Sequence, residues 1–236
     1  MNTRFDRNEK GLAAPAVKET LAGLHRAARA DAFVFLRALP DAVAAKARGK
    51  TAFDGIAPHM KNAYIQISHD AGEMIYNTTR AIDAKRIVEF GTSFGVSAIY
   101  LACAVRDNGG GKVITTELEP TKVKAARQNI ASAGLESYVD VREGDATKTL
   151  VDVEAPIDLV LLDGWKDLYI PLLKMLTPKL HRGSVVFADN INTFRKTLRP
   201  YVTHMRDPHN GFVTTTLATG SGLEYSVYVG ATAMES

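Results

Sequence analysis

Short apolar runs alternate with longer stretches of helical spacing along most of this chain, which predicts strands and helices in turn. Strands are expected at residues 87–90, 112–118, 138–142, 157–162 and 184–188. The run at 157–162 is continuously apolar, which is typical of a strand covered on both faces of a parallel sheet. Helices are expected at residues 95–101, 121–133, 169–180 and 193–205, and a terminal hairpin at 212–219 and 223–229. This order predicts an α/β fold: a doubly wound, mostly parallel sheet that ends in an antiparallel hairpin.

The N-terminal part of the chain has a different pattern. Residues 16–49 are rich in alanine, have helical apolar spacing and are interrupted at Pro40, so they predict two or three helices. We therefore divide the chain into an N-terminal helical extension, residues 1–60, and a main domain, residues 61–236. The extension is expected to pack on the main domain or on a second copy in a homodimer, and a lid over the functional site is the alternative.

The main domain is expected to open with a helix at residues 70–82. Asp70 and Glu73 have the spacing of a capping box, in which each side chain satisfies a backbone N–H at the helix start. His69 stands just before it. A single histidine at a helix start usually has a structural role, and catalysis is the less favoured alternative.

Composition and charge narrow the class of protein. A net charge of +3 in 236 residues, without a cluster of Lys and Arg, gives no reason to expect nucleic-acid or membrane binding. The one cysteine, Cys103, lies in an apolar helical stretch and is expected to be a buried thiol. No apolar run is long enough to span a bilayer, and no leader segment is evident, so we expect a cytoplasmic enzyme.

The chain is organised around a glycine turn between a strand and a helix. The turn reads Glu89-x-Gly91-x-x-x-Gly95, and it lacks the middle glycine of the G-x-G-x-x-G fingerprint of dinucleotide-binding proteins. A helix start after such a turn offers unpaired N–H groups to a ligand. The spacing favours S-adenosylmethionine (SAM) over NAD, and a glycine turn without any ligand is the alternative.

Acidic residues follow the next two strands. Glu117 stands at the tip where a carboxylate can accept both hydroxyls of a ribose. Asp145 stands at the tip after that, where it could accept a hydrogen bond from an adenine amino group or cap the following short helix, and the two roles are compatible. Because ligands of open α/β sheets bind beyond the carboxyl ends of the strands, these acids predict the binding edge.

Two further strand tips supply oxygen ligands for a metal ion. Asp163 ends one strand, and Asp189 with Asn190 ends the next. Two carboxylates and an amide oxygen, completed by water and substrate, suit Mg²⁺. Lys166 follows Asp163 closely enough to reach the same edge and act as a base. The alternative is a surface lysine that pairs with Asp167.

These residues resemble a known family. The string Asp163-Gly164-Trp165-Lys166-Asp167-Leu168-Tyr169, followed by Ala188-Asp189-Asn190, is similar to the metal-dependent class I SAM O-methyltransferases of the catechol and caffeoyl-CoA type. The resemblance covers residues 68–229. It implies that Mg²⁺ is held by Asp163, Asp189 and Asn190, and that the catalytic residues are Lys166, as the base, and Asp163.

The same resemblance implies a set of cofactor-binding residues. The methionine end of SAM would be lined by Ile67, Glu89, Gly91 and Ser97. Glu117 would bind the ribose, and Asp145 and Ala146 would border the adenine. Asp163 and Trp165 would flank the reactive end of the cofactor.

The chain departs from this family at the substrate wall. Gly164 stands where the catechol enzyme has a histidine, and residues 214–217 offer threonines where it has a glutamate, although Glu224 is nearby in sequence. The substrate loops would come from residues 51–67 and 190–194. Aromatic-ring walls are expected among Met60, Tyr64, Trp165 and Phe194.

The resulting hypothesis is a Mg²⁺-dependent transfer of the SAM methyl group to a hydroxyl of a small, catechol-like aromatic acceptor. Two alternatives remain open at this point. One is a metal-independent SAM methyltransferase that acts on an amine or carboxylate, and the other is a SAM-binding protein without catalysis.

Overall fold

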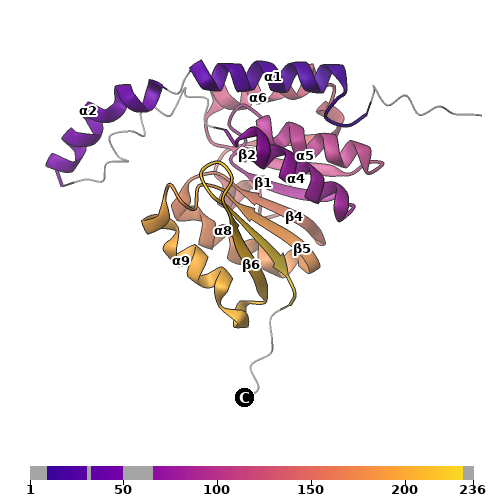
Figure 1. The fold of residues 1–236 in the computed structure, drawn as a ribbon. Coiled ribbons are helices and arrows are strands. Elements are labelled where there is room, and N and C mark those ends of the chain that lie inside the picture. Colours follow the sequence, from indigo (N-terminus) through magenta and orange to yellow (C-terminus); the bar gives the residue numbers. More distant parts are fainter. Residues whose placement is uncertain (1–9, 31–32, 50–65, 231–236) are drawn as a thin grey trace, which may run out of the picture.

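A seven-stranded sheet forms the centre of the molecule (Figure 1). The structure, a computed structural model, describes residues 10–30, 33–49 and 66–230. The strand order is β3-β2-β1-β4-β5-β7-β6, with β1 Arg86–Phe90, β2 Lys112–Glu117, β3 Val139–Glu143, β4 Ile157–Leu162, β5 Leu180–Ala188, β6 Phe212–Leu217 and β7 Leu223–Tyr228. The first five strands pair in parallel, β7 runs antiparallel to β5, and β6 runs antiparallel to β7. The predicted fold class is therefore confirmed.

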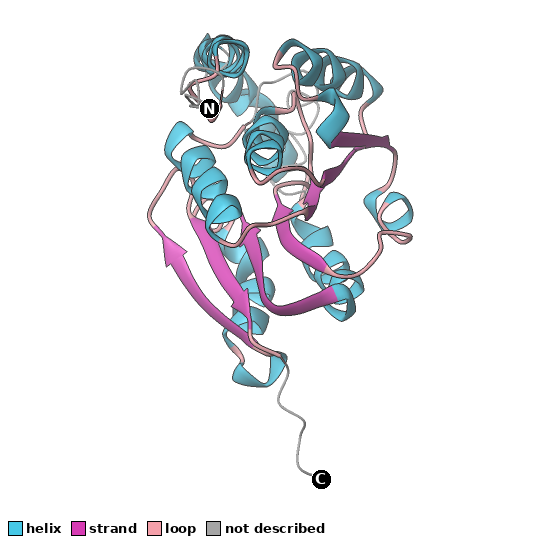
Figure 2. Ribbon diagram, turned by 90° about the vertical axis from the view of Figure 1, so that its right-hand side faces the viewer, coloured by secondary structure: helices cyan, strands magenta, loops and turns pink. Residues whose placement is uncertain are grey.

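Helices cover both faces of the sheet (Figure 2). One face carries α1 Pro15–Ala30, α4 His69–Ala81, α5 Val96–Asp107 and α6 Pro120–Ser132. The other carries α7 Ala146–Thr149, α8 Tyr169–Leu176 and α9 Arg195–Arg206. Helix α2, Phe33–Ala47, and four short 3₁₀ turns complete the described chain, with η1 Glu136–Tyr138, η2 Lys166–Leu168, η3 Thr177–Lys179 and η4 Pro208–Asn210.

The alternation of side chains along the strands explains the two layers. In β1, Ile87 packs into the core under α5, while Val88 and Phe90 pack into the core under α8 and α9. All of them are at most 6% exposed. A strand covered on both faces needs apolar side chains at nearly every position, and Glu89 is the exception in β1.

Several element boundaries differ from the prediction; helix α5, for example, continues past the predicted end at Leu101 to Asp107. Helix α8 ends at Leu176, and the residues predicted as its last turn form η3 and the start of β5. Pro178 has no N–H to continue the helical ladder. Helix α4 begins at His69, because Ser68 is its N-cap and accepts a hydrogen bond from the Ala71 N–H. The capping box predicted at Asp70 was therefore wrong.

The first helix packs on the main domain. Val17, Leu21 and Leu24 of α1 belong to the same buried cluster as Tyr100 of α5. The predicted division at residue 60 and the predicted wall residues Met60 and Tyr64 lie outside the described residues. The homodimer and the cytoplasmic location stay predictions. Across the described ranges, every helix is too short or too polar to cross a membrane.

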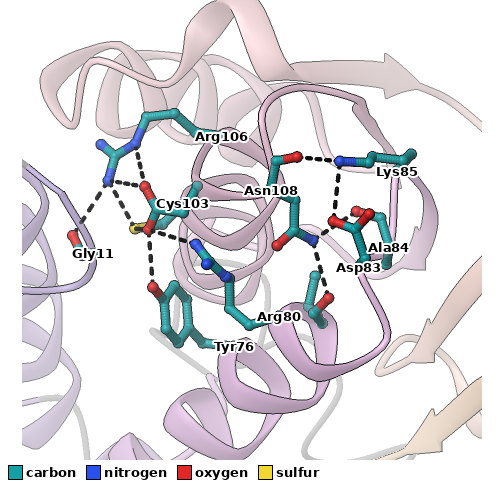
Figure 3. Close-up of polar contacts among 11 residues, drawn as sticks. Gly11, Tyr76, Arg80, Asp83, Ala84, Lys85, Cys103, Arg106 and Asn108 are labelled. Carbon is teal, nitrogen blue, oxygen red and sulfur yellow. Dashed lines mark hydrogen bonds and ion pairs between the residues drawn. The ribbon is translucent and has the colours of Figure 1, made fainter.

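Cys103 lies in the packed region where α4 and α5 end (Figure 3). Its side chain is fully buried, and burial raises the thiol pKa to about 12. Around it, the Tyr76 hydroxyl donates to Asp107 at 2.9 Å, and the Arg106 guanidinium reaches the Gly11 carbonyl oxygen at 3.3 Å. The prediction of a buried core thiol is confirmed.

Gly91 is the tightest point of the turn after β1, and its replacement tests the fold. Its φ is +102°, and an added Cβ would lie 2.7 Å from the backbone of Asp163 and Gly164 at the end of β4. We predict that Gly91→Ala lowers the free energy of unfolding by at least about 3 kcal/mol, because neither backbone can move away.

Gly134→Ala is the matched control. Gly134 also has a positive φ, +68°, but no atom lies within 4 Å of its Cβ position. The loss there should be only about 1 kcal/mol. Urea unfolding of both variants measures the difference, and equal losses would show that the contact with β4 is unimportant.

Candidate functional site

The site lies at the edge where the parallel strands end. Backbone hydrogen bonds continue the ladder beyond the strands: the Asp163 N–H donates to the Phe90 carbonyl at 2.8 Å, and the Asp189 N–H donates to the Leu162 carbonyl at 3.0 Å. The Gly91 N–H likewise reaches the Thr116 carbonyl at 3.1 Å. Neighbouring tips are therefore held side by side, as predicted, so the acids that follow these strands share one edge.

Glu89 is a fully buried acid beneath the glycine turn. One carboxylate oxygen accepts a hydrogen bond from the Thr115 hydroxyl at 2.5 Å, and the other has no partner within the described residues. Burial raises the pKa of Glu89 to about 7, although hydrogen bonds from Ser97 and Thr115 oppose that rise. The hydroxyl of Ser93, in the same turn, is also buried and without a partner in the described chain. Unsatisfied buried polar atoms of this kind are costly unless a ligand completes them.

Glu117 and Asp145 hold the loops around the edge. The Glu117 carboxylate accepts the backbone N–H of Ser93 at 2.8 Å and that of Glu119 at 3.0 Å. Asp145 caps α7 by accepting the Thr147 N–H at 2.9 Å, which confirms the capping role predicted for it. A carboxylate has about four acceptor sites, so both acids can accept further hydrogen bonds from a ligand.

Asp163, Lys166 and Asp189 form the polar centre of the site. Lys166 Nζ lies 3.6 Å from a carboxylate oxygen of Asp163, and both side chains are 11% exposed. Lys166 also donates to the Tyr169 hydroxyl at 2.9 Å, and that hydroxyl donates to the Asp189 carbonyl oxygen at 3.2 Å. The alternative of a surface lysine paired with Asp167 was wrong, because α8 and its preceding turn bury Lys166 against Asp163.

Burial sets the electrostatics of this centre. It raises the pKa of Asp163, and the nearby negative charge of Asp189 raises it further. It also raises the pKa of Asp189 and lowers that of Lys166, while the two carboxylates oppose the change in the lysine. Two carboxylates thus lie near a single buried ammonium group, that of Lys166. The net charge of this centre is negative when both acids are ionised.

Asn190 and Ser221 complete the edge. Ser221 Oγ donates to one Asp189 oxygen at 2.8 Å and accepts from the Asn190 amide at 2.7 Å. That amide also donates to the second Asp189 oxygen at 3.0 Å, and Asn190 has a left-handed φ of +68°. Sequence reasoning missed Ser221, because nothing in Gly220-Ser221-Gly222 distinguishes it from an ordinary turn. It also assigned no role to Tyr169, although Tyr169 belongs to the motif that was quoted.

The residues at these tips fit a hard cation. The described residues contain no cluster of three or more His, Cys, Asp and Glu side chains suited to a metal. The edge instead gathers two buried carboxylates and one amide, whose nitrogen faces Asp189 and whose oxygen is left for a ligand. Their excess negative charge is what a divalent ion would neutralise, and oxygen donors of this kind suit Mg²⁺.

The other predicted site residues differ in exposure. Ile67, Ser97 and Ala146 are buried, at 2%, 5% and 3% exposed, whereas Trp165 is 47% exposed. Phe194 is half-buried, and the Lys166 ammonium lies 5.6 Å from the centre of its ring. His69 accepts or donates a hydrogen bond at 3.0 Å with Tyr100, which is consistent with the structural role favoured for it.

The departures at the substrate wall have a structural explanation. A Cβ at Gly164 would lie 2.4 Å from the Phe90 ring, so this backbone has no room for a histidine. Thr214 and Thr216 donate hydrogen bonds to the fully buried Glu224. Glu224 lies on β7 and is paired with Ala188, the last residue of β5. An acid is therefore present near the predicted substrate wall. It lies on β7, however, and its carboxylate already accepts hydrogen bonds from these two threonines.

Comparison with known proteins relates part of the chain to methyltransferases. Residues 88–191 match a family described as a methyltransferase domain. The chain is 33% identical to a catechol O-methyltransferase of Mycobacterium tuberculosis over 128 residues, which cover 54% of this chain and 57% of that protein. It is 26% identical to a caffeoyl-CoA O-methyltransferase of Medicago sativa over 153 residues, covering 59% and 61% of the two chains. The matched part of the chain is thus similar to O-methyltransferases of the catechol and caffeoyl-CoA type.

Solved structures of O-methyltransferases and of a cofactor-bound protein share the fold of this chain. The O-methyltransferase TomG from Streptomyces achromogenes, in complex with SAM, has a TM-score of 0.63 and 24% identity, covering 70% of this chain and 82% of that one. Cofactor-bound Rv0187 from MTB has a TM-score of 0.68 and 23% identity, covering 94% and 93%. The match to the first two curated relatives spans only 57% and 58% of their lengths.

Glu89 is expected to make the stability of this protein depend on pH. Its pKa is about 7 in the folded chain against an ordinary 4.5, so the unfolded state releases its proton first as pH rises. Folding therefore loses stability between about pH 4.5 and 7, and the loss is complete above pH 7. We predict that Glu89→Gln, which cannot ionise, raises the free energy of unfolding at pH 8 by up to about 3 kcal/mol, with little gain at pH 4.5.

Urea unfolding of the ligand-free protein across this pH range measures the effect. Glu143→Gln, a change at an exposed acid of β3, is the control and should follow the wild type. A stability gain from Glu89→Gln that is the same at every pH would contradict the assignment of a raised pKa to Glu89.

Proposed function

We propose that this protein transfers the methyl group of SAM to a hydroxyl of a small, catechol-like aromatic acceptor in a Mg²⁺-dependent reaction. The observation that carries the proposal is the buried centre in which Lys166 lies 3.6 Å from Asp163 beside a second acid, Asp189. Curated relatives are named catechol and caffeoyl-CoA O-methyltransferases. A buried base and oxygen ligands for a cation are what the ionisation of an acceptor hydroxyl requires.

The cofactor would lie across the tips of β1, β2 and β3. The free oxygen of Glu89 and the Ser93 hydroxyl are buried and without partners in the described chain, and the ammonium of a methionine group can satisfy both. Glu117 would accept the ribose hydroxyls. The remaining contacts that we assign to SAM are those of Ile67, Gly91, Ser97, Asp145, Ala146, Asp163 and Trp165.

Asp163, Asp189 and Asn190 would hold the divalent cation. When bound, the ion supplies Lewis-acid stabilisation of the ionised acceptor oxygen. Ser221 orients two of the three ligands, since its hydroxyl bonds to both Asp189 and Asn190. Outer contacts of this kind fix ligand orientation and contribute to metal affinity.

Lys166 would take the proton of the acceptor. In its neutral form the Nζ atom accepts the hydroxyl proton, and the ionised oxygen then attacks the sulfonium methyl group. The O–CH₃ bond forms as the S–CH₃ bond breaks, the electron pair of that bond stays on sulfur, and S-adenosylhomocysteine leaves. Tyr169 holds Lys166 at the edge through its hydroxyl, and positioning of this kind supplies much of the acceleration in such transfers.

Metal dependence is the first test. We predict that EDTA abolishes methyl transfer to catechol, that Mg²⁺ restores it, and that Asp189→Ala loses at least about 100-fold in kcat/KM, as expected for the loss of a transition-state ligand. Calorimetry should show that the same variant also loses Mg²⁺ binding. SAM binding in EDTA is the control, since Glu89 and Glu117 lie at other strand tips.

Undiminished turnover in EDTA would favour the alternative, a metal-independent methyltransferase acting on an amine or carboxylate. SAM binding without turnover of any acceptor would favour a non-catalytic SAM-binding protein.

Lys166 is the second test. We predict that Lys166→Met lowers kcat about 10²- to 10⁴-fold, the usual contribution of a general base, while the dissociation constant for SAM changes little. Lys174→Met, at an exposed position of α8, is the matched control and should leave kcat unchanged. Equal rates for both variants would remove Lys166 from the reaction.

A further inference from the structure

A basic groove lies between α9 and the edge strand β6. Its volume is about 340 Å³, and its lining includes Arg195, Arg199 and Arg206 from α9 and Thr216 from β6. The three arginines recur at intervals that place them along one side of a helix. The groove carries three positive charges beside apolar side chains such as Ile191 and Val202, and the proposed reaction uses none of its arginines.

The charges in the groove are unevenly compensated. Arg206 donates to Thr216 at 2.8 Å and forms an ion pair with the buried Glu224 at 3.4 Å. The side chains of Arg195 and Arg199, by contrast, make no hydrogen bond or ion pair with any residue in the described part of the chain. Two like charges one helical turn apart repel each other, so the groove has two positive charges available to an anion.

The groove opens beside the proposed metal ligands. Ile191 and Asn192 line it and directly follow Asp189 and Asn190 in the chain. The hairpin fixes this segment, because the N–H groups of Ile191 and Asn192 each donate at 3.0 Å to carbonyl oxygens of the Gly220-Ser221-Gly222 turn. A molecule whose hydroxyls reach Asp189 can therefore extend an arm along α9.

We propose that the groove binds an anionic arm of the methyl acceptor, so that the preferred substrates are dihydroxyphenyl compounds with a side chain that ends in a carboxylate. This inference rests on the proposed function. The guanidinium groups of Arg195 and Arg199 offer the forked donors that match a carboxylate. Arg206, which also lines the groove, is held in place by Glu224 and Thr216.

A matched pair of acceptors isolates the charge. The probes are 3-(3,4-dihydroxyphenyl)propanoate and its neutral amide, which have the same ring and chain length. We expect the wild type to show a lower KM for the acid, and Arg199→Ala to raise the KM for the acid about tenfold, equivalent to about 1.4 kcal/mol. The KM for the amide and the kcat for both acceptors should change less than twofold.

Lys196→Ala is the control, since it removes the same charge from α9 outside the groove lining. It should leave the KM for the acid unchanged. Equal KM changes for acid and amide in Arg199→Ala, or equal effects of the two variants on the acid, would overturn the proposal.

Calorimetry separates this inference from the proposed function. If neither acceptor is methylated, the proposed function fails, and binding of the acid to the protein with S-adenosylhomocysteine still tests the groove. Tighter binding of the acid than of the amide, lost in Arg199→Ala and kept in Lys196→Ala, supports it. The same affinity for both probes in the wild type contradicts it.

Discussion

Two acids and one lysine share a buried corner at the ends of β4 and β5, and the rest of the site depends on how their charges balance. The negative charge of Asp189 raises the cost of ionising Asp163, while the ammonium of Lys166 lowers that cost for both acids. Removal from water strengthens each of these interactions. A divalent cation that neutralises the two acids would also weaken their electrostatic attraction to the Lys166 ammonium. Metal binding and base function are therefore coupled in the proposed mechanism.

The sheet supplies the rigidity that this corner needs. Parallel pairing of β1, β4 and β5 places three strand ends together, and the backbone bonds of Asp163 and Asp189 extend that pairing into the tips. The hairpin then closes the edge, because Ser221 holds both Asp189 and Asn190. Functional side chains are thus carried by short, anchored tips rather than by long loops, which favours precise positioning.

Glu89 illustrates how binding sites are built at the expense of stability. A buried acid with one unpaired oxygen weakens the ligand-free fold. The same oxygen can accept a hydrogen bond from a cationic group of a ligand. Because the Glu89 carboxylate is already removed from water by folding, ligand binding does not have to desolvate it. The groove along α9 has a similar character, since Arg195 and Arg199 place two like charges one helical turn apart in its lining.

The sequence by itself determined the alternation of strands and helices, the acids at the strand tips, and Lys166 within reach of Asp163. Those features are local, because an apolar run, the residue that follows it and a three-residue spacing are all read from neighbouring positions. Only the tertiary structure decided that Ser221 joins Asp189 to Asn190, that Glu224 is occupied by threonines, and that Phe90 leaves no room for a side chain at Gly164. The contacts of Ser221 and of Phe90 join segments far apart in the chain, so they depend on strand order and packing. The contacts of Glu224 depend on the register of the β6–β7 hairpin.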